Sequence, residues 1–165
     1  MAIQTFKQLI EVIDDLEKDG PRGAALLGHA LLESAMRSLL ISRMMPLGKR
    51  EEDALFSGYG PLSTMAARIS VARAFNIISE EARQNLDTIR RIRNRFAHTD
   101  ERIDFDDPKI VALCEKLAIP TRLPKDAVAR RRLFVDMVRL TLTYVESHVT
   151  APWSKFGIDT RVKPA

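Results

Sequence analysis

The sequence contains little of what stabilises small secreted or metal-binding proteins. Its 165 residues include one cysteine, Cys114, and three well-separated histidines. A single cysteine excludes an internal disulfide and is typical of a reducing compartment, so we expect a cytoplasmic protein. Because these residues have no zinc-ligand spacing, we expect no metal site.

Glycine-rich loops and nucleophile motifs are also missing. The chain has no Gly-x-x-x-x-Gly-Lys-Ser/Thr loop, no Gly-x-Gly-x-x-Gly loop and no Gly-x-Ser-x-Gly turn. These absences argue against a P-loop nucleotide hydrolase, a Rossmann-type dinucleotide-binding protein and a serine hydrolase of the α/β type. We therefore expect no cofactor.

The sequence lacks an uninterrupted hydrophobic run. Its most apolar stretch, Gly23 to Met45, is interrupted by four ionisable side chains, His29, Glu33, Arg37 and Arg43. A bilayer would penalise these groups, so the pattern predicts a buried helix rather than a membrane span. The N-terminus has no basic segment followed by an apolar core, so no signal peptide is expected.

What the sequence does contain is typical of a helical protein. Hydrophobic residues make up 45% of the chain, charged residues 29% and aromatic residues 6%. This balance predicts a globular protein and favours helices over strands. We expect an all-α, single-domain helical bundle of about five to six helices over residues 5–150, followed by a C-terminal tail over residues 151–165.

Apolar residues recur at three- and four-residue intervals along most of the chain, which predicts amphipathic helices. The expected helical ranges are roughly 5–18, 21–45, 62–75, 80–97, 108–117 and 126–149, with a short helix near 51–56. Ser79, followed by two glutamates, is a favourable start for the helix over 80–97. In the tail, Trp153 and Phe156 are candidates to dock on the bundle.

The most suggestive chemistry lies near the end of the helix expected over 80–97. Its apolar positions are Ala82, Leu86, Ile89 and Phe96, and Arg93 falls in the same register, which predicts a core position for Arg93. Asn94 and His98 are four residues apart and share a helix face. Together the three side chains suit phosphodiester cleavage. His98 would be the general acid or base, Arg93 would stabilise phosphate charge, and Asn94 would orient the site.

A structural role is an equally good explanation of these residues. Arg93 would then pair with an acid in the core, Asn94 would cap the helix, and His98 would bond to a loop carbonyl. The candidate acid is Glu33, in the apolar helix expected over 21–45. It pairs either with Arg37, four residues along the same helix, or with Arg93 across the core.

Basic residues are concentrated in two helices. They are Arg90, Arg91, Arg93 and Arg95 in one, and Arg130, Arg131 and Arg132 in the other. Such clusters either bind phosphates or form a solvated helix surface. We take Arg90 and Arg95, together with Glu33, as candidate binding residues. The net charge of +4 permits contact with RNA without requiring it.

The helices expected over 62–75 and 80–97 have lengths compatible with a helix-turn-helix. A recognition helix, however, must expose its side chains to the DNA groove. The apolar stripe of the second helix indicates burial instead, so direct DNA binding is not expected.

Several segments together resemble the mannitol operon repressor family. They are Arg22-Gly23-Ala24-Ala25-Leu26-Leu27-Gly28 with Leu32-Glu33, Gly60-Pro61-Leu62-Ser63 with Arg68-Ile69, Ile89-Arg90-Arg91-Ile92-Arg93-Asn94 through Ala97-His98, and Phe105-Asp106-Asp107-Pro108 leading to Leu113-Cys114. The resemblance covers roughly residues 5–120. It implies an all-α fold and a transcriptional regulator, which we expect to act mainly through a regulatory protein partner.

The segment Arg93-Asn94-x-x-x-His98 also resembles the signature of the higher-eukaryote-and-prokaryote nucleotide-binding (HEPN) helical superfamily. In active members of that superfamily, an arginine followed by a polar residue and a later histidine form a ribonuclease site, often across a dimer. The resemblance implies a homodimer and, as the alternative function, a metal-independent ribonuclease that uses Arg93, Asn94 and His98. Other members bind nucleotides or partners without cleavage, so the regulator remains the first expectation.

Overall fold

The computed structural model describes residues 20–118 and 123–149, and within them the chain forms helices and no strand. The helices are α2 (Pro21–Ile41), α3 (Lys49–Phe56), α4 (Met65–Ala74), α5 (Glu80–Ala97), α6 (Pro108–Cys114) and α7 (Ala127–Val149). The predicted all-α class is confirmed. The helix predicted over 5–18 and the tail predicted over 151–165 lie outside the described residues.

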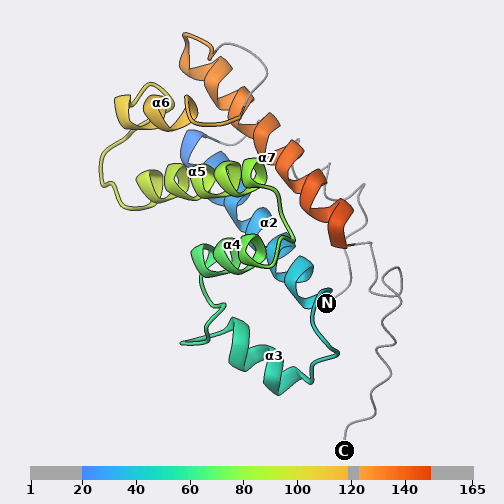
Figure 1. Ribbon diagram of the computed structural model, residues 1–165. Helices are drawn as coiled ribbons and strands as arrows, with labels where there is room; N and C mark the ends of the chain where they lie inside the picture. The colour runs from blue at the N-terminus through green and yellow to red at the C-terminus, as the bar shows by residue number, and fades with distance from the viewer. Residues whose placement is uncertain (1–19, 119–122, 150–165) are drawn as a thin grey trace, which may run out of the picture.

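The central helix of the bundle is α2 (Figure 1). It packs against α4, α5 and α7. By length and composition it is the one described helix that could cross a membrane, but half of its most apolar window is buried inside the bundle. Packing against three helices accounts for this apolar character. The helix ends at Ile41 rather than at the predicted Met45, and the Ser42 hydroxyl donates to Leu39 O at 2.7 Å just beyond its end.

A tight joint connects α4 to α5. Asn76 has a φ of 54°, a left-handed conformation that asparagine tolerates better than most residues. The Ser79 hydroxyl then accepts a hydrogen bond from Ala82 N at 3.1 Å and caps α5. The bounds of α5 agree with the predicted range 80–97, whereas α4 is shorter than the predicted 62–75. From this start α5 runs through the bundle in contact with α2, α4, α6 and α7.

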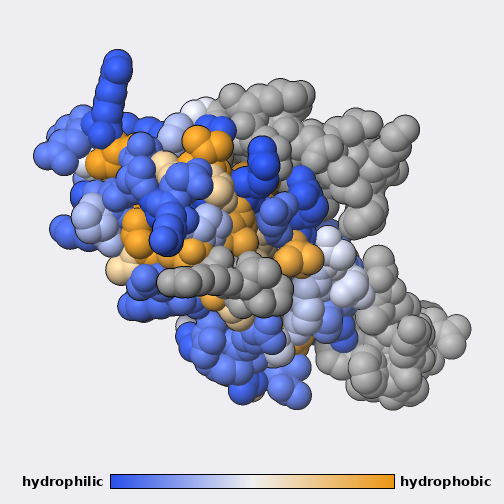
Figure 2. Space-filling view, turned by 90° about the horizontal axis from the view of Figure 1, so that it is seen from above, coloured by the Kyte–Doolittle hydropathy of each residue, from blue (hydrophilic) through white to orange (hydrophobic). Residues whose placement is uncertain are grey.

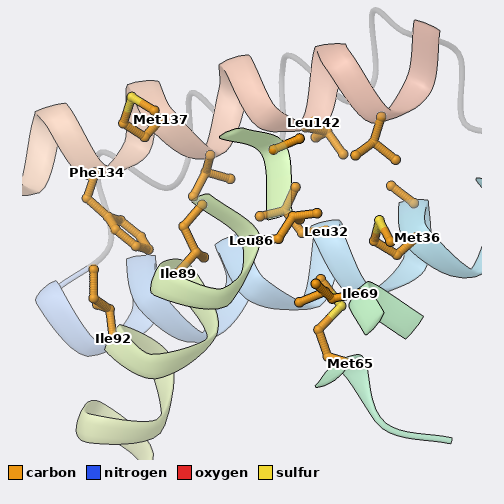
Figure 3. Close-up of a cluster of buried hydrophobic side chains, with 14 of the residues drawn as sticks. Leu32, Met36, Met65, Ile69, Leu86, Ile89, Ile92, Phe134, Met137 and Leu142 are labelled. Carbon is orange, nitrogen blue, oxygen red and sulfur yellow. The ribbon is translucent and has the colours of Figure 1, made fainter. Parts of the chain in front are cut away.

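Side chains from several helices fill one core. Figure 3 shows Leu32 of α2, Ile89 of α5 and Phe134 of α7 in a shared interior, where each is fully buried. Phe105 packs between Phe96 and Phe134, with ring centroids 5.3 Å apart in both pairs. Because Phe105 lies between α5 and α6, this aromatic row ties a non-helical segment to the core.

The connection between α3 and α4 requires a glycine. Leu62 N donates to Leu55 O at 2.9 Å across this turn. A Cβ atom on Gly60 would lie 2.4 Å from the backbone oxygen of Ala54. Any other residue would therefore force the backbone apart. The turn directs the carbonyl oxygens of Leu62 and Ser63 toward α4, where an arginine binds them.

Candidate functional site

The end of α5 places Arg93, Asn94 and His98 at the surface of the bundle. Arg93 Nη1 donates to Asn94 Oδ1 at 3.0 Å, and both side chains are half-buried. His98 caps the helix: its backbone N–H donates to Asn94 O at 3.1 Å, and its imidazole is exposed. The structure therefore joins Arg93 to Asn94. Within the described residues, it shows no hydrogen bond from the His98 imidazole to either of them.

The predicted core position of Arg93 is wrong. The buried stripe of α5 passes through Ile89, Ile92 and Phe96, so Arg93 lies beside the stripe and is half-buried. A partly exposed guanidinium keeps much of its hydration and does not require a carboxylate in the core. In the part of the chain that the structure describes, Arg93 bonds to the Asn94 amide and forms no ion pair.

The other two arginines named as binding candidates form ion pairs. Arg90 Nη2 lies 2.7 Å from Asp87 Oδ1, and Arg91 Nε lies 2.8 Å from Asp87 Oδ2. Arg95 Nη2 donates to Asp107 Oδ2 at 2.8 Å. This hydrogen bond, helped by backbone N–H groups at the start of α6, holds the pKa of Asp107 below its usual value. Arg95 therefore links α5 to the capped start of α6.

Glu33 has a partner other than the two predicted ones. Its carboxylate oxygen Oε1 lies 3.6 Å from Arg68 Nη1, and its backbone oxygen accepts from the same nitrogen at 3.0 Å. Arg37 instead pairs with Glu52 at 2.7 Å. Neither the Glu33–Arg37 pair nor the Glu33–Arg93 pair forms among the described residues, because α4 brings Arg68 against α2.

His29 lies on α2 in a positively charged environment that also includes α5. It is 5% exposed, its Nδ1 lies 3.9 Å from Glu33 Oε2, and its Nε2 is buried with no hydrogen-bond partner in the described structure. Burial lowers the pKa of His29. Glu33 partly opposes this effect, and the charges of Arg93, Arg90 and Arg68 lower the pKa further. These effects favour the neutral form of His29.

Arg68 is a buried residue that sequence analysis did not identify as structural. Its Nε donates to Leu62 O at 2.7 Å, and its guanidinium carbon lies 5.5 Å from the centre of the Phe56 ring. Together with its bonds to Glu33, these contacts join α2, α3 and α4. The helical register could have predicted its burial, because Arg68 lies between the apolar positions Met65 and Ile69 on the buried side of its helix.

Arg130 is also buried, and its predicted place in a surface cluster is wrong. Its Nε donates to Phe105 O at 2.8 Å and its Nη1 to Pro124 O at 2.9 Å. Its Nη2 forms an ion pair with Asp106. With these partners, Arg130 holds the segments on both sides of α6 against α7. It is four residues before the buried Phe134, so register again indicates burial where charge alone does not.

The chemistry available at the end of α5 is anion binding beside an imidazole. A half-exposed arginine offers several donors to a phosphate or carboxylate. An exposed imidazole can act as a general acid or base once a reacting atom lies within hydrogen-bond reach. Within residues 20–118 and 123–149, no group of three or more His, Cys, Asp or Glu side chains could hold a metal ion.

These contacts define an all-helical bundle that presents a cation-rich helix end at its surface. The chain belongs to the mannitol repressor family, because the model of that family, MtlR, matches residues 11–134. The family resemblance stated from the sequence is thereby confirmed. A comparison with curated proteins finds no match.

Among solved structures, the fold is similar to that of a chain in the X-ray structure of the MtlR–HPr complex from Escherichia coli. The two chains share 19% sequence identity with a TM-score of 0.63, over 89% of this chain and 99% of the other. At this identity the likeness shows the fold, and it agrees with the helical bundle described above. The resemblance to the HEPN signature stays a prediction.

Proposed function

We propose that the protein is a cytoplasmic transcriptional regulator that acts mainly through contacts with a protein partner. The family match over residues 11–134 is the observation that supports a regulator. The packing of α5 against four helices supports the protein-contact mode. A helix buried in this way does not expose the side chains that a recognition helix needs in the DNA groove.

The proposed partner is a protein similar to HPr. The Escherichia coli chain with the similar fold is found in a complex with HPr. Figure 2 shows hydrophobic residues exposed among hydrophilic ones on one face of the bundle. Among the described residues, exposed large hydrophobic side chains include Leu27, Met45, Tyr59, Val128 and Leu140. Surfaces of this kind support protein contacts, and we include a homodimer in the proposal.

Titration calorimetry with HPr from the same organism tests the partner directly. We expect saturable binding to HPr. Binding to DNA from the regulated promoter should be weak and should disappear as salt is raised, because non-specific phosphate contacts are salt-dependent. Sequence-specific DNA binding without HPr binding would contradict the protein-contact mode. Light scattering on the same sample tests the homodimer.

A metal-independent ribonuclease is the second candidate function. The contact between Arg93 and Asn94, with His98 exposed one turn away, is the observation that favours it. In this proposal Arg93 would stabilise charge on the phosphate, Asn94 would orient the guanidinium, and His98 would transfer the proton.

RNA cleavage by the wild type and by His98→Ala, in EDTA, tests this candidate. His148→Ala is the matched control, because α7 places His148 near the start of α5 rather than near its end. Cleavage that is lost in folded His98→Ala and kept in His148→Ala would support a ribonuclease. If the wild type cleaves none of a range of RNAs, the ribonuclease is excluded and the regulator stands alone.

A further inference from the structure

A large apolar groove lies where the end of α2, the α4–α5 joint and the end of α7 meet. Its volume is about 700 Å³. Its apolar lining consists of Leu40, Met44, Val71, Phe75, Ile77 and Ile78. Phe75 is 76% exposed beside this hollow. Contiguous apolar surface of this kind usually marks a site that another chain segment or molecule covers.

The last turns of α7 form one wall of the groove, lined by Tyr144 and His148. The Tyr144 hydroxyl accepts a hydrogen bond from Ser79 N at 2.9 Å, which fixes α7 against the start of α5. Arg43 Nη2 donates to His148 O at 2.8 Å, which fixes the end of α7 against the end of α2. The chain therefore leaves α7, after Val149, at the edge of the groove.

The sequence that follows α7 has suitable side chains for this lining. Residues 150–165 include Trp153, the single tryptophan of the chain, and Phe156. Trp153 comes four residues after Val149, a separation that an extended chain spans over up to about 14 Å. A hollow of several hundred cubic ångströms accommodates a drug-sized ligand. It is therefore large enough for two aromatic rings.

Arg43, which also lines the groove, places a hydrogen-bond donor there that needs an acceptor. Its Nε is buried and has no hydrogen-bond partner among the described residues. A buried donor without an acceptor is unfavourable. A main-chain carbonyl of a segment laid over the groove would supply the missing acceptor.

Residues 1–19 join the bundle at the other end of α2 from this groove. They precede α2 at Pro21, whereas the groove is lined by Leu40 and Met44 at the other end of that helix. A helix of 21 residues is about 31 Å long. The segment after α7 begins at the groove itself.

We propose that residues 150–165 fold back over this groove as its intramolecular occupant. Trp153 and Phe156 pack on the apolar lining, and a main-chain carbonyl of the segment accepts from Arg43 Nε. The groove is then covered by the chain's own C-terminal segment and is not part of the surface offered to a partner protein.

Intrinsic fluorescence of the full chain tests this proposal, because Trp153 is the single tryptophan. We expect its emission to be blue-shifted relative to the same chain in denaturant and its quenching by acrylamide to be several-fold weaker. Phe75→Asp places a charge in the groove at a side chain that is 76% exposed, so the fold should hold. In this variant, the emission should shift to the red and the quenching constant should rise several-fold.

Val128→Asp is the matched control, because Val128 is 63% exposed and lies in the first turn of α7, away from the groove. It should leave both readings unchanged, and circular dichroism should confirm that both variants are folded. A second variant, Phe156→Ala, should increase quenching of Trp153 without touching the groove itself.

Three results would overturn the proposal. In the first, Trp153 of the wild type has the emission and quenching of the denatured chain. In the second, Trp153 is protected but does not respond to Phe75→Asp, so it packs elsewhere. In the third, protection is lost on dilution, which assigns the groove to a second copy of the chain.

Discussion

Two regions of the molecule use arginine in opposite ways. In the interior, Arg68 and Arg130 are 5% and 6% exposed and donate to main-chain carbonyls from several segments. At the end of α5, Arg93 is half-exposed and bonds to one neighbouring amide. Burial, rather than the local density of basic residues, therefore distinguishes an arginine that holds the fold from one that is available to an anion.

The largest effect is expected from Arg130→Met. This change keeps the volume of the side chain but leaves the carbonyl oxygens of Phe105 and Pro124 and the Asp106 carboxylate without their donor. Loss of one partner from such a buried network should lower the free energy of unfolding by about 3 kcal/mol. Urea denaturation measures this value. The exposed Arg132→Met is the control, and an equal loss in both variants would contradict the interior role of Arg130.

A smaller loss of stability is expected from Asp107→Ala, because Asp107 joins the end of α5 to the start of α6. Asp107 caps α6 by accepting from Lys109 N and Ile110 N, and it also accepts from Arg95. Loss of the cap should cost about 1 kcal/mol. Because Arg95 lowers the pKa of Asp107, the stabilisation is present above the usual pKa of 3.8 and is lost as pH falls below it. Asp100→Ala, an exposed site, should change little in the same urea titration.

A pH-dependent effect is expected at His29, near the arginines of both regions. Burial lowers the pKa of His29 in the folded state, and Arg93, Arg90 and Arg68 lower it further against the opposing charge of Glu33. The unfolded chain takes up this proton at about pH 6.5. The free energy of unfolding should therefore decrease as pH falls below 6.5.

His29→Gln removes the titrating group and should flatten this dependence, as measured by urea denaturation at several pH values. His98→Gln is the control, because His98 is exposed and the dependence should remain. If His29→Gln keeps the full slope below pH 6.5, other groups are responsible.

The smallest effect on stability is expected from Arg93→Ala. This arginine is half-exposed and has one hydrogen bond to a neighbouring amide, so the free energy of unfolding should change by less than about 0.5 kcal/mol. Binding of RNA or of an acidic protein surface should weaken at the same time. If Arg93→Ala lost as much stability as Arg130→Met, it would contradict the contrast between a half-exposed arginine and a buried one.

Much of the fold follows from local signals in the sequence. The bounds of α5 are predictable because Ser79 and two glutamates mark its start and a regular apolar stripe marks its length. The end of α2 is less predictable, since apolar residues continue past Ile41 into the turn. Propensity and periodicity report local structure, and they do not indicate where packing allows a helix to stop.

The ion pairs between different helices are not predictable from spacing. Glu33 and Arg68 are 35 residues apart, and their contact exists because α4 crosses α2. The sequence predicts Arg37, on the same helix, or Arg93 as the partner of Glu33. Packing of α4 against α2 brings Arg68 to it instead. For Arg93, the error is one of register, because the stripe continues through Ile92. The roles of Arg93, Asn94 and His98 depend on a reacting atom that spacing does not locate, and they stay predictions.

The burial of Phe105 changes how the connection between α5 and α6 should be treated in protein engineering. By secondary structure this stretch is a loop, and loops commonly accept insertions and protease cuts. Here Phe105 is fully buried between two other rings, and Arg130 binds its carbonyl oxygen. A cut or an inserted tag would open the interior. Tyr59, whose side chain is fully exposed, is the better position for a label.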